Sequence, residues 1–251
     1  MLQAESRRVR EALIAKLRDI LPRQFVLTET EQLRPYECDG LTAYRQLPWI
    51  VVLPSNSEEV EKILALCTAC GVPVVARGAG TGLSGGALPH PHGVLLSMTR
   101  LDRILSVDRA NRTARVQPGV RNIAISEEVE GMGLYYAPDP SSQIACSIGG
   151  NVAENSGGVH CLKYGLTVHN ILKLEVVLMS GESVTIGADA LDMPGYDLLA
   201  LMTGSEGMLG VVTEVTVRLL PKPAVARVIL AAFDDLAMAG NAVAAIIGAG
   251  I

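Results

Sequence analysis

Residues 73–85 read PVVARGAGTGLSG, and the fold expected for the whole chain follows from this stretch. Its first part, Pro73–Ala76, predicts a short strand, because β-branched residues favour extended backbone. Four glycines follow within the stretch and a fifth, Gly86, comes directly after it, whereas a tight turn needs one or two. Without side chains in the way, successive backbone N–H groups can converge on phosphate oxygens. The stretch therefore predicts a strand followed by a diphosphate-binding loop.

Two better-known glycine motifs overlap this loop, and both fail on context. Gly80–Gly85 fits G-x-G-x-x-G, which has meaning only where it opens a helix. Gly82–Gly86 fits the G-x-S-x-G elbow of hydrolases, which needs the same strand-to-helix setting. Glycine and proline recur up to Gly93, so no helix is expected here. We therefore set aside a Rossmann site and a serine hydrolase.

Two further glycine-rich clusters occur downstream, at 147–158 and 204–212. Glycine loses much conformational freedom when it is ordered. Three such clusters are explained if their backbone surrounds one long polar ligand.

The cysteines do not indicate a metal site. Cys67 and Cys70 form a C-x-x-C, but no second pair completes a zinc site, and small buried residues on a helix explain them better. The chain has five cysteines, an odd number with no disulfide spacing, which fits a reducing cytoplasm. No metal ligand is assigned.

Composition excludes several partners. The chain has 251 residues, of which 49% are hydrophobic and 19% charged, with a net charge of −5. No run of Lys or Arg offers a docking stripe for nucleic acid, and no apolar run is long enough to span a membrane. The composition predicts a folded chain with a sizeable core.

The periodicity predicts a chain of mixed α+β type. Helices are expected at 2–20, from Asn56 to Gly71, 121–130, 196–202 and 236–247. Strands are expected at 49–53, 73–76, 94–97, 104–108, 113–117, 172–179, 183–186, 211–220 and 225–232. Residues 137–158 are rich in Pro, Gly, Ser and Asn, and no helix or strand is assigned to them. Pro221 and Pro223 predict a domain boundary, and the single strand and helix beyond it suggest that the next domain is truncated.

Together, 73–85, 138–142, 147–158, 163–167 and 204–213 resemble the FAD-binding domain of the vanillyl-alcohol oxidase and p-cresol methylhydroxylase type. Within that family they are most similar to the glycolate oxidase D-subunit and the D-lactate dehydrogenases. The resemblance implies two α+β subdomains, about 24–108 and about 109–222, with FAD between them. Residues 1–222 would be the FAD-binding domain, and 223–251 the start of a truncated substrate-binding cap.

The resemblance also implies the cofactor contacts. The pyrophosphate would be cradled by Arg77, Gly78, Ala79, Gly80, Thr81, Gly82, Ser84 and Gly85. The ribityl and ring region would be lined by Pro138, Asp139, Ser141, Ser142, Ile148, Gly149, Gly150 and Asn151, with Asn155 and Gly158 close to the flavin. The adenosine end would be held by Glu206, Gly207, Gly210 and Val212. Thr81 stands where some relatives carry a flavin-linked His, which implies non-covalent FAD.

The implied function is FAD-dependent oxidation of a small 2-hydroxy acid, such as glycolate or D-lactate, to the 2-oxo acid. An electron acceptor or iron–sulfur partner subunits are implied as possible partners. No catalytic base is assigned, because in relatives it lies largely beyond this stretch. The alternative is an FAD-binding module or fragment without turnover of its own.

Overall fold

The computed structural model describes residues 2–188 and 194–250. The chain divides into two units, Met1–Pro221 and Lys222–Ile251, and each is described by itself.

The first unit begins with a four-stranded sheet of order β1-β2-β4-β3. Its strands are β1 (Val26–Leu27), β2 (Ile50–Val52), β4 (Val94–Ser97) and β3 (Val74–Arg77). The last three are parallel to one another, and β1 is antiparallel to β2. Ile50 and Val52 belong to one core cluster and Val51 to another, because successive side chains of a strand alternate between the two faces.

Helices cover both faces of this sheet. The cluster that contains Ile50 also holds buried side chains from α1 (Leu2–Ile20) and α3 (Ser57–Ala69). The cluster that contains Val51 holds Leu33, from the short helix α2 (Thr30–Leu33). A sheet with both faces buried can consist of continuous apolar runs, as β2 does.

Helix α3 is capped by Asn56, the residue at which the predicted helix begins. The side chain of Asn56 accepts a hydrogen bond from the backbone N–H of Glu59 at 2.9 Å, which satisfies one of the donors left free in a first helical turn. Gly71 follows the helix with φ +63°, a conformation that favours glycine.

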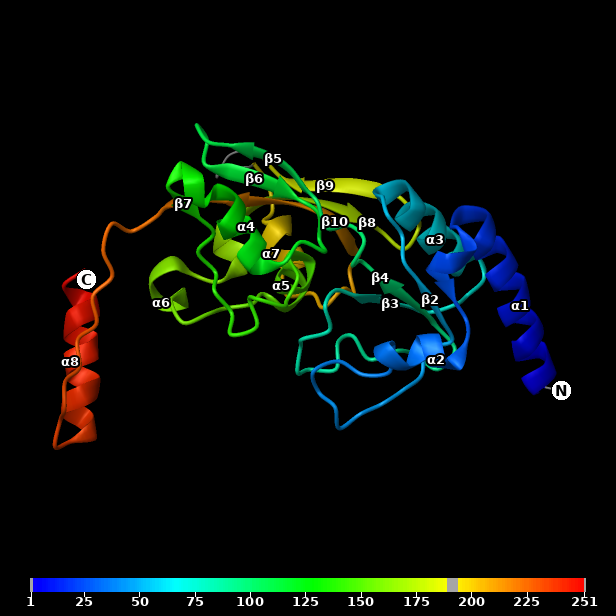
Figure 1. Cartoon of the computed structure of the whole chain (residues 1–251), viewed down its shortest axis with the longest axis horizontal. Helices are drawn as coiled ribbons and strands as arrows, with labels where there is room; N and C mark the ends of the chain where they lie inside the picture. Colours follow the sequence, from blue (N-terminus) through cyan, green and yellow to red (C-terminus); the bar gives the residue numbers. More distant parts are fainter. Residues whose placement is uncertain (1, 189–193, 251) are drawn as a thin grey trace. The chain divides into compact units, whose positions relative to one another are not determined.

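The second sheet has five antiparallel strands in the order β5-β6-β10-β8-β9. They are β5 (Ile104–Asp108), β6 (Thr113–Val116), β10 (Val211–Arg218), β8 (Ile171–Val177) and β9 (Ser183–Gly187). Residues of α4 (Asn122–Val129), α5 (Ile148–Glu154) and α7 (Leu198–Met202) complete its core. Figure 1 shows these helices on one side of the sheet. The two sheets confirm the predicted α+β class.

Short elements complete the first unit. They are η1 (Arg23–Phe25), η2 (Arg34–Tyr36), η3 (Glu130–Met132), α6 (Cys161–Tyr164), η4 (Thr167–Asn170) and the two-stranded pair of β7 (Leu134–Tyr135) with β11 (Leu220–Pro221).

The predicted boundary between the subdomains needs a correction. β5 was assigned to the first subdomain, but it pairs with β6 in the second sheet. The two strands are joined by the hairpin turn at 109–112, and strands joined by so short a turn pair with each other. The first subdomain therefore ends before Ile104.

The two sheets share packing. Val177 and Val211, from the second sheet, belong to the core cluster of the first. Thr68 on α3 donates a hydrogen bond to the carbonyl oxygen of Met179, and Ser183 donates one to the carboxylate of Glu61. Helix α3 is therefore packed against both subdomains.

Residues 148–154 form helix α5 in a segment to which no helix was assigned. One local prediction was wrong. The strand expected at 225–232 does not form, because an extended segment becomes a strand only beside a partner, and no described strand pairs with it. In the same unit, α8 (Leu236–Gly248) forms as predicted. No helix of the described residues has the length and apolar character needed to cross a bilayer.

Candidate functional site

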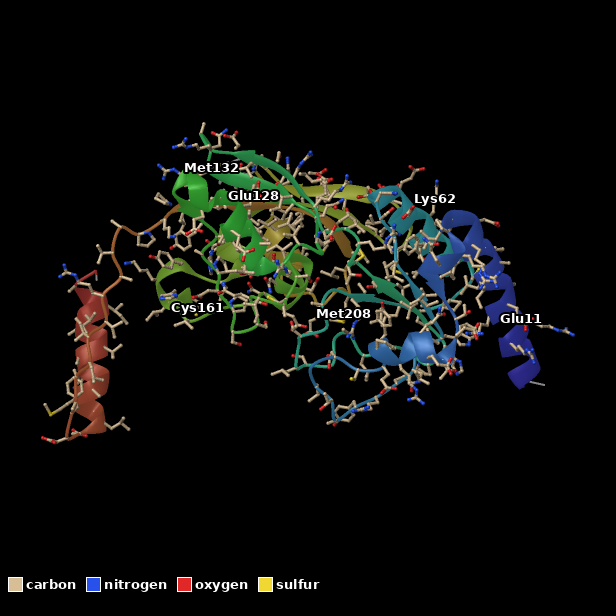
Figure 2. The ribbon with its side chains drawn as sticks, viewed as in Figure 1. Glu11, Lys62, Glu128, Met132, Cys161 and Met208 are labelled. Carbon is tan, nitrogen blue, oxygen red and sulfur yellow. The ribbon has the colours of Figure 1, made fainter. Side chains whose placement is uncertain are left out.

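A cavity of about 340 Å³ lies where the three glycine-rich stretches meet within the first unit. Its wall is formed by the loop after β3, by residues around α5, and by the loop that leads into β10. Met208, labelled in Figure 2, belongs to that last loop, beside the cavity residue Gly207. The volume falls within the range typical of small-molecule sites.

Most of the predicted cofactor residues line this cavity, although they come from three separate parts of the sequence. Those in the wall are Arg77, Gly78, Ala79, Gly80, Thr81, Gly82, Ser141, Ser142, Gly149, Gly150, Asn151, Glu206, Gly207, Gly210 and Val212. Those outside it are Ser84, Gly85, Pro138, Asp139, Ile148, Asn155 and Gly158. Ile148 is buried in the core of the second subdomain, where an apolar side chain is expected. Whether each lining residue contacts the cofactor stays a prediction.

The loop after β3 approaches its neighbours too closely for side chains. A Cβ on Gly78 would lie closer than 3.0 Å to the hydroxyl of Ser147. A Cβ on Gly80 would collide with the guanidinium of Arg77, and Gly80 also has φ +70°. Ser147 is itself the N-cap of α5, where its hydroxyl accepts from the N–H of Gly150 at 3.4 Å. Close backbone packing therefore joins this loop to the second subdomain.

Arg77 lies beneath the loop as a buried positive charge. Its Nη1 donates a hydrogen bond to the carbonyl oxygen of Cys38 at 2.7 Å, and the guanidinium lies 5.8 Å from the ring centroid of Tyr36. Burial lowers the pKa of Arg77, and the charge of nearby Asp39 opposes that effect. Arginine stays protonated in proteins. The loop therefore combines unshielded backbone N–H groups with a cation, which suits a bound diphosphate.

A buried polar network supports the middle of the cavity wall. The side-chain oxygen of Asn151 accepts from Nδ2 of Asn122 at 2.9 Å. Its own Nδ2 donates to Sγ of Cys146 and to the hydroxyl of Ser156, each at 3.3 Å. Because both ends of the amide are satisfied, the side chain of Asn151 has one orientation.

Three of the predicted residues outside the cavity have structural roles. Asp139 Oδ2 lies 2.6 Å from Nδ1 of His160. A Cβ on Gly158 would overlap the side chain and the backbone of Asp139, so glycine is required there. Asn155 has φ +49°, and its side chain accepts from the N–H of Val168 at 3.1 Å. These contacts shape the loop between α5 and α6.

Two acidic residues in the wall, Asp39 and Glu154, belong to no motif that could have identified them in advance. Asp39 comes from the irregular segment before β2. Glu154 ends α5, which was not expected. Partial burial, the charge of Glu206 and the charge of Asp39 together raise the pKa of Glu154. With Glu206, these residues give the cavity three carboxylates.

Comparison with known proteins agrees with this architecture. The model of the FAD binding domain family matches residues 48–187. The chain is 64% identical over 242 residues to the glycolate oxidase subunit GlcD of Escherichia coli strain K12, covering 96% of this chain and 48% of that protein. It is 37% identical over 225 residues to a D-lactate dehydrogenase of Anaerostipes hadrus, covering 89% and 47%.

Among solved structures, p-cresol methylhydroxylase with substrate bound is similar, with a TM-score of 0.74 and 21% identity, over 86% of this chain and 44% of that one. At this identity the likeness concerns the fold alone, and it confirms the predicted fold type.

The chain belongs to the FAD binding domain family, as its sequence motifs predicted. It spans about half the length of the curated relatives that it matches. The residues present fit FAD, because glycine backbone and the Arg77 cation meet in one cavity with an unpaired hydrogen-bond acceptor, Oδ2 of Asp39.

Proposed function

We propose that this chain is the FAD-binding part of an oxidoreductase that converts a small 2-hydroxy acid, such as glycolate or D-lactate, to the 2-oxo acid. The observation that carries the proposal is the cavity itself, built from three glycine-rich stretches in a chain that is 64% identical to a glycolate oxidase subunit. Relatives named for oxidising glycolate and D-lactate support the substrate class.

The chain's own residues would bind and orient the cofactor. Backbone N–H groups of 78–82 would hold the diphosphate above the buried charge of Arg77. The hydroxyls of Ser141 and Ser142 and the fixed amide of Asn151 line the same cavity and would orient the flavin end. When bound, FAD supplies the acceptor for the hydride that leaves the hydroxy acid. Thr81 stands where some relatives carry a flavin-linked His, so we propose that the FAD is non-covalent.

The comparisons favour this proposal over an FAD-binding module without turnover, because the similarity to a named oxidase subunit extends over 96% of the chain. We further propose a partner subunit or other electron acceptor, since that relative is itself named as a subunit. A cytoplasmic location is part of the same proposal and rests on the odd number of cysteines.

The test is anaerobic flavin reduction. The purified chain is expected to show oxidised-flavin absorbance, and acid denaturation is expected to release that flavin as intact FAD. In the oxidoreductase that contains this chain, glycolate or D-lactate should then bleach the flavin, and L-lactate serves as the stereochemical control. If that oxidoreductase binds FAD but neither glycolate nor any D-2-hydroxy acid reduces it, the proposed activity is wrong. If it binds no flavin, the cofactor assignment fails as well.

A further inference from the structure

Asn122 is a buried polar residue that lies behind the cavity wall. It is 1% exposed and begins α4, and it does not itself line the cavity. Its Nδ2 donates to the carbonyl oxygen of Pro138 at 3.1 Å and to Oδ1 of Asn151 at 2.9 Å. Its Oδ1 accepts from Nε2 of Gln143 at 3.4 Å. Both protons of this buried amide are therefore used, and they reach two separate stretches of the chain.

The backbone beside this amide adds further contacts. The N–H of Asn122 is one of the donors that a first helical turn leaves free, and it donates to the carbonyl oxygen of Cys146 at 3.0 Å. The N–H of Ile123 donates to the carbonyl oxygen of Gln143 at 3.1 Å. Asn122 therefore holds the segment 138–146 at both ends, and the next residue holds it between them.

The segment 138–146 forms part of the cavity wall, through Ser141, Ser142 and Cys146. It is also contacted by the exposed side chains of Arg121 and His160, at positions where water competes for the same hydrogen bonds. The hydrogen bonds from Asn122 are buried, so water cannot replace them.

Loss of the Asn122 side chain would leave two buried acceptors without a donor, the carbonyl oxygen of Pro138 and Oδ1 of Asn151. A buried polar group without a partner is costly. The segment 138–146 and the amide of Asn151 would have to move to find new donors. Both belong to the cavity wall, so the wall would change shape there.

Asn170 provides a comparison within the same chain. It is also buried, at 2% exposed, and its Nδ2 donates to the carbonyl oxygens of Tyr164 and Leu166, each at 2.9 Å. Neither of these two residues lines the cavity. Asn170 therefore matches Asn122 in residue type, burial and the use of both amide protons, but its contacts shape a loop outside the wall.

We propose that Asn122 is a positioning residue for the flavin. It fixes the segment 138–146 and the amide of Asn151 from behind the wall, and so holds the groups that orient the flavin end of FAD. The inference rests on the proposed function, which assigns Ser141, Ser142 and Asn151 to that end. Asn122 acts through these residues, since it does not line the cavity.

The test measures the Kd for FAD of the whole chain after removal of its flavin, and the visible circular dichroism of the flavin at saturation. In Asn122→Ala we expect the Kd to rise about tenfold, the size of one lost hydrogen bond. The circular dichroism should change, because the groups around the ring are no longer held in one arrangement. A residue that only stabilised the fold would lower Tm and leave the spectrum of the bound flavin as it is.

The matched control is Asn170→Ala, which also removes two hydrogen bonds made by a buried amide. It should lower Tm, but keep the Kd for FAD within about twofold of wild type and leave the flavin spectrum unchanged. Asn122→Ser is the second variant, in case Asn122→Ala does not fold. Its shorter hydroxyl cannot reach both acceptors, so the Kd should rise about threefold or more, with the spectrum changed in the same direction.

Two results would overturn the proposal. The Asn122 variants could bind FAD with the Kd and the flavin spectrum of wild type, or Asn170→Ala could change both as much as Asn122→Ala does. Failure of the wild-type chain to bind FAD would instead refute the proposed function, so the two failures are distinguishable.

Discussion

The contact between Gly78 and Ser147 permits a quantitative test of how the cofactor loop is held. In Gly78→Ala the new methyl would lie closer than 3.0 Å to the Ser147 hydroxyl, a separation that real Cβ atoms essentially never show. The next atoms are at ordinary contact distance, 3.5 Å for Cβ of Ser147 and 3.7 Å for the nitrogen of Gly150. One hydroxyl therefore accounts for the whole clash.

That hydroxyl can rotate away only by giving up its role as the cap of α5. Loss of a serine cap costs about 1 kcal/mol. Some crowding of the new methyl remains after this rotation, so Gly78→Ala should lower the free energy of unfolding by about 1–3 kcal/mol in total. Ser147→Ala alone should cost about 1 kcal/mol. It removes the clashing atom, so the double variant should be about as stable as Ser147→Ala alone.

The assay is a double-mutant cycle of denaturant unfolding, followed by thermal melts. Each kcal/mol should shift Tm by about 2–4 °C in a domain of this size. A coupling above about 0.5 kcal/mol, with Ser147→Ala rescuing Gly78→Ala, supports the reasoning. If the two losses simply add, the loop does not rest on Ser147, and the packing argument is refuted.

Three other predictions follow from the same structure. Gly158→Ala should lower the free energy of unfolding by about 3 kcal/mol or more, because its methyl overlaps backbone atoms of Asp139 that cannot rotate away. The control in the same melts is Gly131→Ala, where a methyl would enter open space. If both variants lose the same free energy of unfolding, the prediction is wrong. Glu154→Gln should raise Tm at pH 8, since a carboxyl with a raised pKa loses stability as pH rises above its ordinary value of 4.5. Solvent screening keeps the gain in free energy of unfolding below about 1 kcal/mol. This gain should vanish as the pH falls toward 4.5. A gain that does not depend on pH would refute the prediction. Acid should release all flavin from the protein, because Thr81 lacks the imidazole through which some relatives link the flavin. Flavin that stays with the precipitate would contradict this.

Elements with a local physical cause were predictable from the sequence. The strands at Val94–Ser97 and Ile104–Asp108 have the predicted bounds, because short runs of apolar or alternating residues end there at polar or glycine-rich turns. Helix α3 could be predicted from its Asn56 cap and its apolar face. The glycine clusters indicated a common ligand, because glycine loses much conformational entropy when it is ordered and binding to a ligand would offset that cost.

Features that depend on tertiary partners were not predictable. Helix α5 contains two glycines and forms because its apolar residues Ile148 and Val152 pack into the second core. The segment 225–232 has strand composition but no described strand beside it. Asp39 lies in a stretch without periodicity, and only folding brings it to the cavity. Local composition indicates the propensity of a segment for helix or strand. The structure of α5, of 225–232 and of the cavity around Asp39 depends instead on residues distant in the chain.

The contacts that hold the two subdomains together and the contacts that form the cavity are partly the same. Gly78 both lines the cavity and packs on Ser147 of the other subdomain, so its substitution should weaken folding and cofactor binding together. Gly158 supports a loop outside the cavity wall, so its substitution should lower the free energy of unfolding more than the affinity for FAD. Asp39 has an unpaired acceptor in the wall, so its conservative replacement should affect binding first. A ligand that binds only the folded state stabilises it in proportion to its affinity, so melts with and without FAD separate these three cases.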